Sequence, residues 1–259
     1  MNTGELFCLK GRTALITGGS RGIGRMIAAG FIAQGARVYI SARKAVACDE
    51  TAKELALHGH CVSLPCDVST IDGCKALAAA YAQHEDDLDI LVNNAGAAWG
   101  MPFDEFSEGG WDKVVDLNLK TPFFLTQTLV ELLRKAAIKA QRPAKVINIA
   151  SIDGITVNPQ ETYSYAASKA GLIQLTRRMA IKLIEDNIVV SAIAPGAFAS
   201  DMNRDARDHG DTVKERIPAK RIGTDEDMAG AAIYLASRAG DYVVGSTIVV
   251  DGGVTHLRG

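Results

Sequence analysis

Short apolar runs alternate with longer amphipathic stretches along this whole chain. The stretches, at 23–35, 44–59, 70–85, 110–138, 163–186 and 225–237, have the apolar spacing of helices. The runs are rich in Val, Ile and Leu with little polar alternation, and they lie at 12–17, 36–41, 60–66, 88–94, 144–150, 187–194 and 246–251. Such runs are typical of parallel strands buried on both faces. The alternation predicts an α/β fold with a seven-stranded parallel sheet and helices on both faces.

The predicted architecture is a single doubly wound (Rossmann) domain over residues 1–259. No internal repeat, low-complexity tract or linker divides the chain. The segment 197–220 is polar and irregular, and a long irregular segment in a compact domain often serves an active site. We therefore expect a lid-like insertion there that orders over bound ligands.

Composition excludes several classes of function. A formal net charge of −2 leaves no basic excess for a nucleic-acid backbone. No apolar run reaches the roughly 18 residues of a membrane span. The N-terminus enters the first strand without the cationic and apolar regions of a signal peptide. We expect a cytoplasmic protein that binds neither nucleic acid nor membrane.

The five cysteines, at positions 8, 48, 61, 66 and 74, form no tight framework, so we expect reduced thiols. Four potential zinc ligands lie close together in the sequence: His58, His60, Cys61 and Cys66. A zinc site is therefore one interpretation of this segment. The alternative is a helix end that runs into a strand. We favour the alternative and predict no metal.

The glycine-rich turn "TGGSRGIG" lies at 17–24, between the first strand and the first helix. Gly18, Gly22 and Gly24 allow a tight turn and let a pyrophosphate approach the helix N-terminus, where free N–H groups favour negative charge. A tight turn without any ligand is the alternative. Because the glycine-rich motif follows the first strand of an α/β chain, we favour the nucleotide site.

The end of the second strand indicates which dinucleotide binds. An NAD site has an acid there, but this chain reads "ISARK", with Ser41 and Arg43 and no acid before Asp49. Arg43 and Arg21 suit a 2′-phosphate through forked, charge-assisted hydrogen bonds. The alternative is that Arg43 begins a solvated helix. We predict NADP(H) in preference to NAD(H).

The stretch "TYSYAASKAG", at 162–171, has two tyrosines and one lysine. On a helix, residues four apart share a face, so Lys169 pairs with Tyr165, whereas Tyr163 pairs with Ala167. A free tyrosine titrates near 10, and a nearby ammonium group is expected to lower the pKa of Tyr165 so that the phenol can transfer a proton. Such pairs also occur by chance on helix surfaces.

Several motifs together resemble the short-chain dehydrogenase/reductase family. They are "TGGSRGIG", "NNAG" at 93–96, "LNLK" around Asn118, "NIAS" ending at Ser151, "YAASK" at 165–169 and "APG" at 194–196, and they cover nearly the whole chain in the family's order. The resemblance implies a nicotinamide cofactor and a catalytic tetrad of Asn118, Ser151, Tyr165 and Lys169.

The resemblance also implies roles. Tyr165 would protonate a carbonyl oxygen that Ser151 hydrogen-bonds, Lys169 would hold the nicotinamide ribose, and Asn118 would position a water. Ser200 stands where the family commonly has threonine, and Ser191 where it often has asparagine. The implied cofactor contacts are Gly18, Ser20, Arg21, Gly22, Ile23, Gly24, Ser41, Arg43, Asp67, Val68, Asn94, Gly96, Tyr165, Lys169, Pro195, Gly196 and Ser200.

Within the family the chain is most similar to NADPH-dependent 3-oxoacyl (β-ketoacyl) reductases, including the rhamnolipid-pathway type. We expect a partly apolar substrate pocket from Trp99, Ile152, Ile155, Val157, Phe198 and Met202. Basic residues for docking acyl carrier protein would be Arg134, Lys135, Lys139 and Arg142, but Ile181 stands where such reductases often have arginine.

Three functions stay open at this point. The first is reduction of a 3-oxoacyl thioester of carrier protein or CoA. The second is oxidation or reduction of another small ketone, polyol or sugar acid on the same tetrad. The third is a nucleotide-binding regulator without turnover.

A homotetramer is the assembly that the resemblance implies. Two features agree with it: the last strand ends near a sheet edge, and two helices have apolar residues beyond what one sheet face needs. Those residues are Leu129, Leu132, Leu133, Leu172, Leu175 and Met179.

Overall fold

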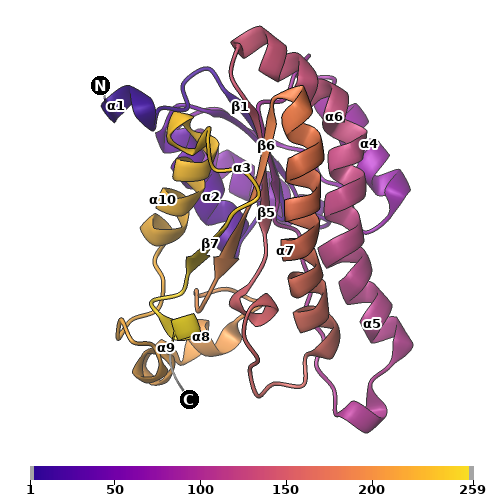
Figure 1. The fold of residues 1–259 in the computed structure, drawn as a ribbon, viewed down its shortest axis with the longest axis vertical. Coiled ribbons are helices and arrows are strands. Elements are labelled where there is room, and N and C mark those ends of the chain that lie inside the picture. The colour runs from indigo at the N-terminus through magenta and orange to yellow at the C-terminus, as the bar shows by residue number, and fades with distance from the viewer. Residues whose placement is uncertain (1–2, 257–259) are drawn as a thin grey trace.

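The computed structural model describes residues 3–256, apart from the side chain of Arg204, and contains one seven-stranded parallel sheet (Figure 1). The strand order is β3-β2-β1-β4-β5-β6-β7. The strands are β1 (Thr13–Thr17), β2 (Arg37–Ser41), β3 (Cys61–Ser63), β4 (Ile90–Asn93), β5 (Ala144–Ile149), β6 (Ile188–Pro195) and β7 (Thr247–Val250). The predicted doubly wound fold is confirmed.

Helices cover both faces of this sheet (Figure 1). One layer consists of α2 (Gly22–Ala33), α3 (Ala45–Ala56) and α10 (Asp225–Ala236). The other consists of α4 (Ile71–Tyr81), α6 (Thr121–Ala140) and α7 (Tyr163–Leu183), and α5 (Glu108–Val115) precedes α6. A short helix, α1 (Thr3–Leu6), precedes β1.

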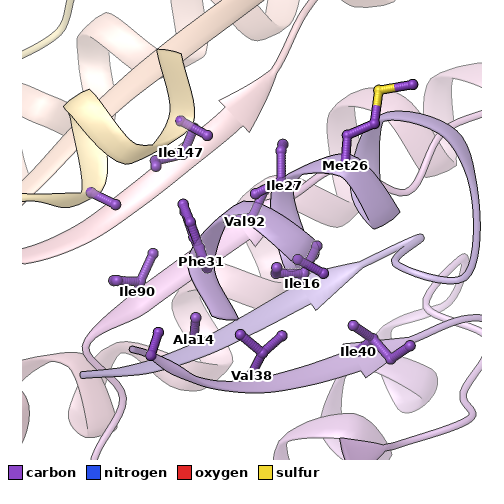
Figure 2. Packing of buried hydrophobic residues seen from close by; sticks show 14 of the residues in the cluster. Ala14, Ile16, Met26, Ile27, Phe31, Val38, Ile40, Ile90, Val92 and Ile147 are labelled. Atoms are coloured by element: carbon purple, nitrogen blue, oxygen red, sulfur yellow. The ribbon is translucent and has the colours of Figure 1, made fainter. Parts of the chain in front are cut away.

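Burial on both faces explains why the strands are continuously apolar. In β1, Ala14 and Ile16 pack against the α2 layer, while Leu15 packs against the α4 layer. Figure 2 shows Ile27 and Phe31 of α2 over this first face, with the even-numbered side chains of β1, β2 and β4. All five residues of β1 are buried.

The predicted helix over 110–138 is interrupted in the structure. A π-helical turn, Asp116–Lys120, joins α5 to α6, and it contains the buried Asn118. π turns are rare and often occur at functional sites. The hydrophobic spacing could not predict this turn, because one extra residue within a long apolar stretch barely changes the pattern.

The segment 197–220 is more structured than expected. It contains α8 (Arg204–Asp208), α9 (Gly210–Val213) and a 3₁₀ turn, Lys214–Arg216. Phe198, Ala206 and Ile217 are buried, so three apolar side chains anchor a segment that was expected to be irregular.

The apolar surplus expected on α6 and α7 is also absent. Leu129, Leu133, Leu172 and Met179 are buried within one subunit, and Leu132 and Leu175 pack partly buried against the same core. Because these side chains are buried within one subunit, they give no evidence about assembly.

In the described part of the chain, no helix has the length and apolarity that crossing a bilayer requires.

Candidate active site

The glycine-rich turn has the backbone geometry that its sequence requires. Gly18 and Gly22 have φ of +64° and +51°, a region that other residues rarely adopt. At Gly24 a Cβ would lie 2.3 Å from the Gly18 carbonyl oxygen, so only glycine fits. Arg21, at the N-cap of α2, makes no side-chain cap, which leaves the first N–H groups of the helix available to an anion.

Asn94 holds this turn against the sheet. Its Nδ2 donates to the carbonyl oxygens of Thr17 (2.9 Å) and Gly18 (3.1 Å), and its backbone N–H donates to Thr17 Oγ1 (3.0 Å). Gly96 lies beside Asn118, whose Oδ1 would be 3.3 Å from a Cβ there. Asn94 is therefore a structural tie from the end of β4 to the nucleotide turn.

The two arginines predicted for the 2′-phosphate differ in their surroundings. Arg43 is exposed at the end of β2 and has no hydrogen-bond or ion-pair partner within residues 3–256. Arg21 forms an ion pair with Asp201, which also pairs with Arg207. Ser41 is buried, and its hydroxyl makes no hydrogen bond to the described residues.

The other predicted cofactor contacts lie along the same edge of the sheet. Asp67 is exposed and accepts a hydrogen bond from Ser69 N–H (3.0 Å), and Val68 is buried. Gly196 follows the end of β6, and its N–H donates to the Val250 carbonyl oxygen of β7 (2.9 Å). Three further residues lie around the glycine turn: Ser20 and Ile23 within it, and Ser200 against Gly22. Pro195 ends β6 and is buried.

Asn118 is held on three sides. Its Oδ1 accepts from Ala97 N–H (2.8 Å), and its Nδ2 donates to the Ala97 carbonyl oxygen (2.9 Å) and to Ser168 Oγ (3.1 Å). The side chain thus clamps the segment after β4 to α7.

Ser151 and Tyr165 come from neighbouring elements. Ser151 follows β5 and caps the 3₁₀ turn Ile152–Gly154, where its Oγ accepts from Asp153 N–H (3.1 Å). Burial raises the pKa of Tyr165 to about 12, and a hydrogen bond with Ser151 acts in the opposite direction.

Lys169 shares a face of α7 with Tyr165, as the spacing predicts. Its Nζ lies 5.6 Å from the centroid of the Tyr165 ring and donates to the Ile149 carbonyl oxygen at 2.6 Å. Burial lowers the pKa of Lys169 to about 8. The expectation that this ammonium lowers the pKa of Tyr165 is wrong here, because burial dominates at both groups.

Tyr163 contacts a different set of residues from Tyr165. It is half exposed, its hydroxyl donates to Glu161 Oε1 (2.9 Å), and its ring packs edge-on against Phe103 and Phe106. Of the two tyrosines, only Tyr165 lies beside both Ser151 and Lys169.

The geometry at this edge agrees with the comparisons. A family model described as "Enoyl-(Acyl carrier protein) reductase" matches residues 18–255. The chain belongs to the short-chain dehydrogenase/reductase family. The chain is 46% identical over 254 residues to the rhamnolipids biosynthesis 3-oxoacyl-[acyl-carrier-protein] reductase of Pseudomonas aeruginosa, covering 97% of this chain and 98% of that one.

Other members of this short-chain dehydrogenase/reductase family act on sugar acids. The 2-dehydro-3-deoxy-D-gluconate 5-dehydrogenase of Dickeya dadantii is 40% identical over 255 residues, covering 95% of this chain and 96% of the relative. Among solved structures, the Pseudomonas aeruginosa RhlG/NADP active-site complex superposes with a TM-score of 0.93 and 44% identity, covering 98% of this chain and 100% of that one. The predicted family and the prediction of an oxidoreductase are confirmed.

The apolar residues expected to line the substrate pocket differ in their exposure. Ile155 and Met202 are exposed near Ser151 and Gly96, and Val157 is 99% exposed. Phe198, in contrast, is 2% exposed and packs in the core against Gly223, so its placement in the pocket is wrong. Trp99 packs against Gly110 with Lys113 over its ring.

The basic residues expected to dock acyl carrier protein lie at the wrong end of the sheet. They belong to the C-terminal part of α6 and the loop before β5, whereas the site lies at the carboxyl ends of the strands (Figure 1). Three of them already form ion pairs: Arg134 with Glu131 and Asp186, Lys139 with Asp87, and Arg142 with Asp241.

Two further residues lie at this site that the sequence did not predict, Ser168 and Asp153. Ser168 accepts from Asn118, and Asp153 lies two residues after Ser151 with a charge that acts on both Tyr165 and Lys169. An acid so close in sequence to the predicted Ser151 was the available signal.

All five cysteines are free thiols. Between residues 3 and 256, no three His, Cys, Asp or Glu side chains converge as metal ligands, so His58, His60, Cys61 and Cys66 form no such cluster.

Proposed function

We propose that this protein is an NADPH-dependent carbonyl reductase that transfers hydride to the ketone of a 3-oxoacyl thioester, carried by CoA or by acyl carrier protein. The observation that carries the proposal is the convergence of Ser151, Tyr165 and Lys169 at the same edge of the sheet as the glycine-rich turn. These groups lie at the carboxyl ends of the central strands, where open α/β sheets bind ligands.

The residues present fit NADP(H), which when bound supplies the hydride. Gly18, Gly22 and Gly24 leave room for a pyrophosphate at the uncapped start of α2. The free guanidinium of Arg43 suits a 2′-phosphate, and no acid stands at the end of β2 to favour an unphosphorylated ribose. Asp67 and Val68 would border the adenine.

At the nicotinamide end, Asn94, Gly96, Pro195, Gly196 and Ser200 would surround the cofactor. The assignment of these five residues as cofactor contacts rests on their positions, because all five lie at the ends of β4 and β6 or against the glycine turn.

Tyr165 would donate its proton to the substrate oxygen. Its raised pKa keeps the phenol protonated near neutral pH, which suits a proton donor. The Ser151 hydroxyl would stabilise negative charge on the same oxygen. Lys169 would hold the ribose, and Asn118 would fix the Ala97 backbone beside it.

A thioester substrate is supported by the apolar mouth and by the 46% identical relative, which is named for 3-oxoacyl-[acyl-carrier-protein] reduction. The alternative is a sugar acid or polyol, supported by relatives such as the Dickeya dadantii dehydrogenase. A regulator without turnover is disfavoured because Asn118, Ser151, Tyr165 and Lys169 are all present.

We also propose a cytoplasmic homotetramer, with no nucleic-acid or membrane partner. Five free thiols suit a reducing compartment. Exposed apolar side chains on the outer helices, Phe123 of α6 and Ile181 of α7, offer surface to a second subunit.

A panel assay tests the substrate. We expect NADPH oxidation with acetoacetyl-CoA and faster oxidation with a longer 3-oxoacyl thioester, because the mouth is apolar. Sugar-acid ketones should react slowly. Preference for the sugar acids would replace the thioester proposal, and no turnover with any ketone would support the regulator.

A further inference from the structure

The segment that follows β6 reaches back onto the glycine-rich turn. A Cβ at Gly22 would lie 3.1 Å from Ser200 Cβ. Asn203 fixes the chain just beyond this contact, because its N–H donates to Ser200 Oγ (3.1 Å) and its Oδ1 accepts from Ala206 N–H (3.1 Å) at the start of α8. Asp201, the residue after Ser200, is therefore held beside the start of α2.

Asp201 pairs there with Arg21 of the glycine-rich turn. Arg21 Nη1 contacts Asp201 Oδ2, and no other carboxylate in residues 3–256 pairs with this guanidinium. The charge of Arg21 is the largest cause that holds the pKa of Asp201 below its usual value. Arg21 is one of the two arginines proposed to bind the 2′-phosphate of NADP(H). A carboxylate of the chain thus already uses a cation that the phosphate of the cofactor would need.

The second carboxylate oxygen of Asp201 has a partner of its own. Asp201 Oδ1 contacts Arg207 Nη1, while Arg207 Nε and Nη2 donate to the two carboxylate oxygens of Asp208 (2.7 and 2.9 Å). Asp201 would therefore remain paired with Arg207 if Arg21 turned toward a phosphate. The exchange of partners by Arg21 leaves no unpaired carboxylate behind.

Solvent exposure decides which anion holds Arg21. The side chains of Arg21 and Asp201 are 69% and 43% exposed, and exposed ion pairs shift an equilibrium by no more than about fivefold. A charge-assisted contact to phosphate corresponds to roughly ten- to a hundredfold. The phosphate should therefore displace Asp201, but it binds Arg21 more weakly than it would bind a guanidinium without a partner.

We propose that Asp201 competes with the 2′-phosphate for Arg21 and thereby limits the preference of the protein for NADPH over NADH. The inference rests on the proposed role of Arg21 in NADP(H) binding. NADH has no 2′-phosphate, so it leaves the ion pair intact and its affinity does not depend on Asp201. Arg43 has no partner within residues 3–256 and lies outside this competition.

Removal of the carboxylate charge should strengthen the binding of NADPH. Asp201→Asn frees Arg21 and should lower the Kd for NADPH, measured by fluorescence titration, about two- to fivefold. The Kd for adenosine 2′,5′-bisphosphate, measured by calorimetry, should fall by the same factor, because this probe has the 2′-phosphate but no nicotinamide. The Kd for NADH should not change.

Two further variants separate competition for Arg21 from other effects of charge. In an Arg21→Ala background, Asp201→Asn should have no further effect on the Kd for NADPH. Glu54→Gln is the matched control, because it removes an exposed acid that pairs with Arg25 (3.3 Å), one turn further along α2, and it should leave the Kd unchanged. An unchanged or higher Kd in Asp201→Asn, or an equal fall in the Arg21→Ala background or in Glu54→Gln, would overturn the proposal.

Because these measurements need no turnover, they keep the inference separate from the proposed function. If no ketone is reduced but Asp201→Asn tightens the binding of NADPH, the competition stands and the substrate proposal fails. If ketones are reduced and the Kd is unchanged, the competition fails alone. An Arg21→Ala variant that binds NADPH as tightly as the wild type would also overturn the competition, whatever the substrate.

Discussion

Tyr165 and Tyr163 lie two residues apart, yet the structure separates their chemistry. Tyr165→Phe should lower turnover by about 10²-fold or more, because a positioned proton donor contributes roughly 10²–10⁴-fold. NADPH should still bind, since the ring remains. Steady-state kinetics and fluorescence titration with NADPH measure the two effects.

Tyr163→Phe is the matched control. It removes only the hydroxyl that donates to Glu161, on an exposed face, and should keep most activity. If Tyr163→Phe is inactive and Tyr165→Phe active, the assignment of the proton donor is wrong.

Arg43 and Arg21 should contribute unequally to NADPH recognition. Within residues 3–256 Arg43 has no partner to give up, whereas Arg21 must exchange its ion pair with Asp201 for the phosphate. A charge-assisted contact to phosphate contributes roughly 1.5–3 kcal/mol, about one to two decades in affinity. Arg43→Ala should raise the KM for NADPH by that factor, Arg21→Ala by less, and neither should change the KM for NADH.

Arg25→Ala provides the control for these arginines. Arg25 lies one turn into α2 and pairs with Glu54 on the surface, so its loss should leave both cofactors unaffected. Equal use of NADPH and NADH by the wild-type protein would contradict the cofactor assignment.

The segment between β6 and α10 combines anchors with exposed charge. Phe198, Ala206 and Ile217 are buried, while Asp201, Arg207 and Asp211 lie on the surface. We expect slow hydrogen exchange near the anchors and fast exchange at 201–205 and 207–216 without ligand. NADPH with a substrate analogue should protect these fast parts, because the segment starts directly after Gly196 and its Ser200 packs against Gly22.

Exchange measured on Tyr165→Phe with NADPH serves as the control, since that variant should bind cofactor without turnover. Strong protection of 201–216 already in the free protein, unchanged by ligand, would show a fixed surface segment that gates nothing.

In the whole subunit, helices cover the sheet on both faces, and some apolar side chains remain exposed on α6 and α7. The six residues of the predicted surplus are buried or partly buried, whereas Phe123, Ile138 and Ile181, which were not among them, are exposed. We expect light scattering at micromolar concentration to give about four times 27.5 kDa, near 110 kDa. Ile181→Lys should weaken an interface through α7 and lower that mass.

Ile138→Lys, on the distant C-terminal end of α6, is the comparison variant and tests whether that end is also covered. A stable wild-type monomer across the concentration range would contradict the tetramer.

Short sequence patterns were enough to predict the strands, the glycine-rich turn and the choice between the two tyrosines. The continuous apolar runs predicted all seven strands, because burial on both faces removes polar alternation. The three glycines predicted the nucleotide turn, since steric limits on φ act within a few residues. Helical periodicity alone separated Tyr165 from Tyr163.

Only the tertiary structure decided the properties that depend on distant neighbours. Arg21 pairs with Asp201, 180 residues away in sequence. Phe198 is buried because Gly223 lies against its ring, and Leu129 is buried because α6 packs on the sheet and on α4. The pKa values of Tyr165 and Lys169 follow the same rule: spacing placed the two groups together, but desolvation by the surrounding fold is the largest cause of each pKa shift.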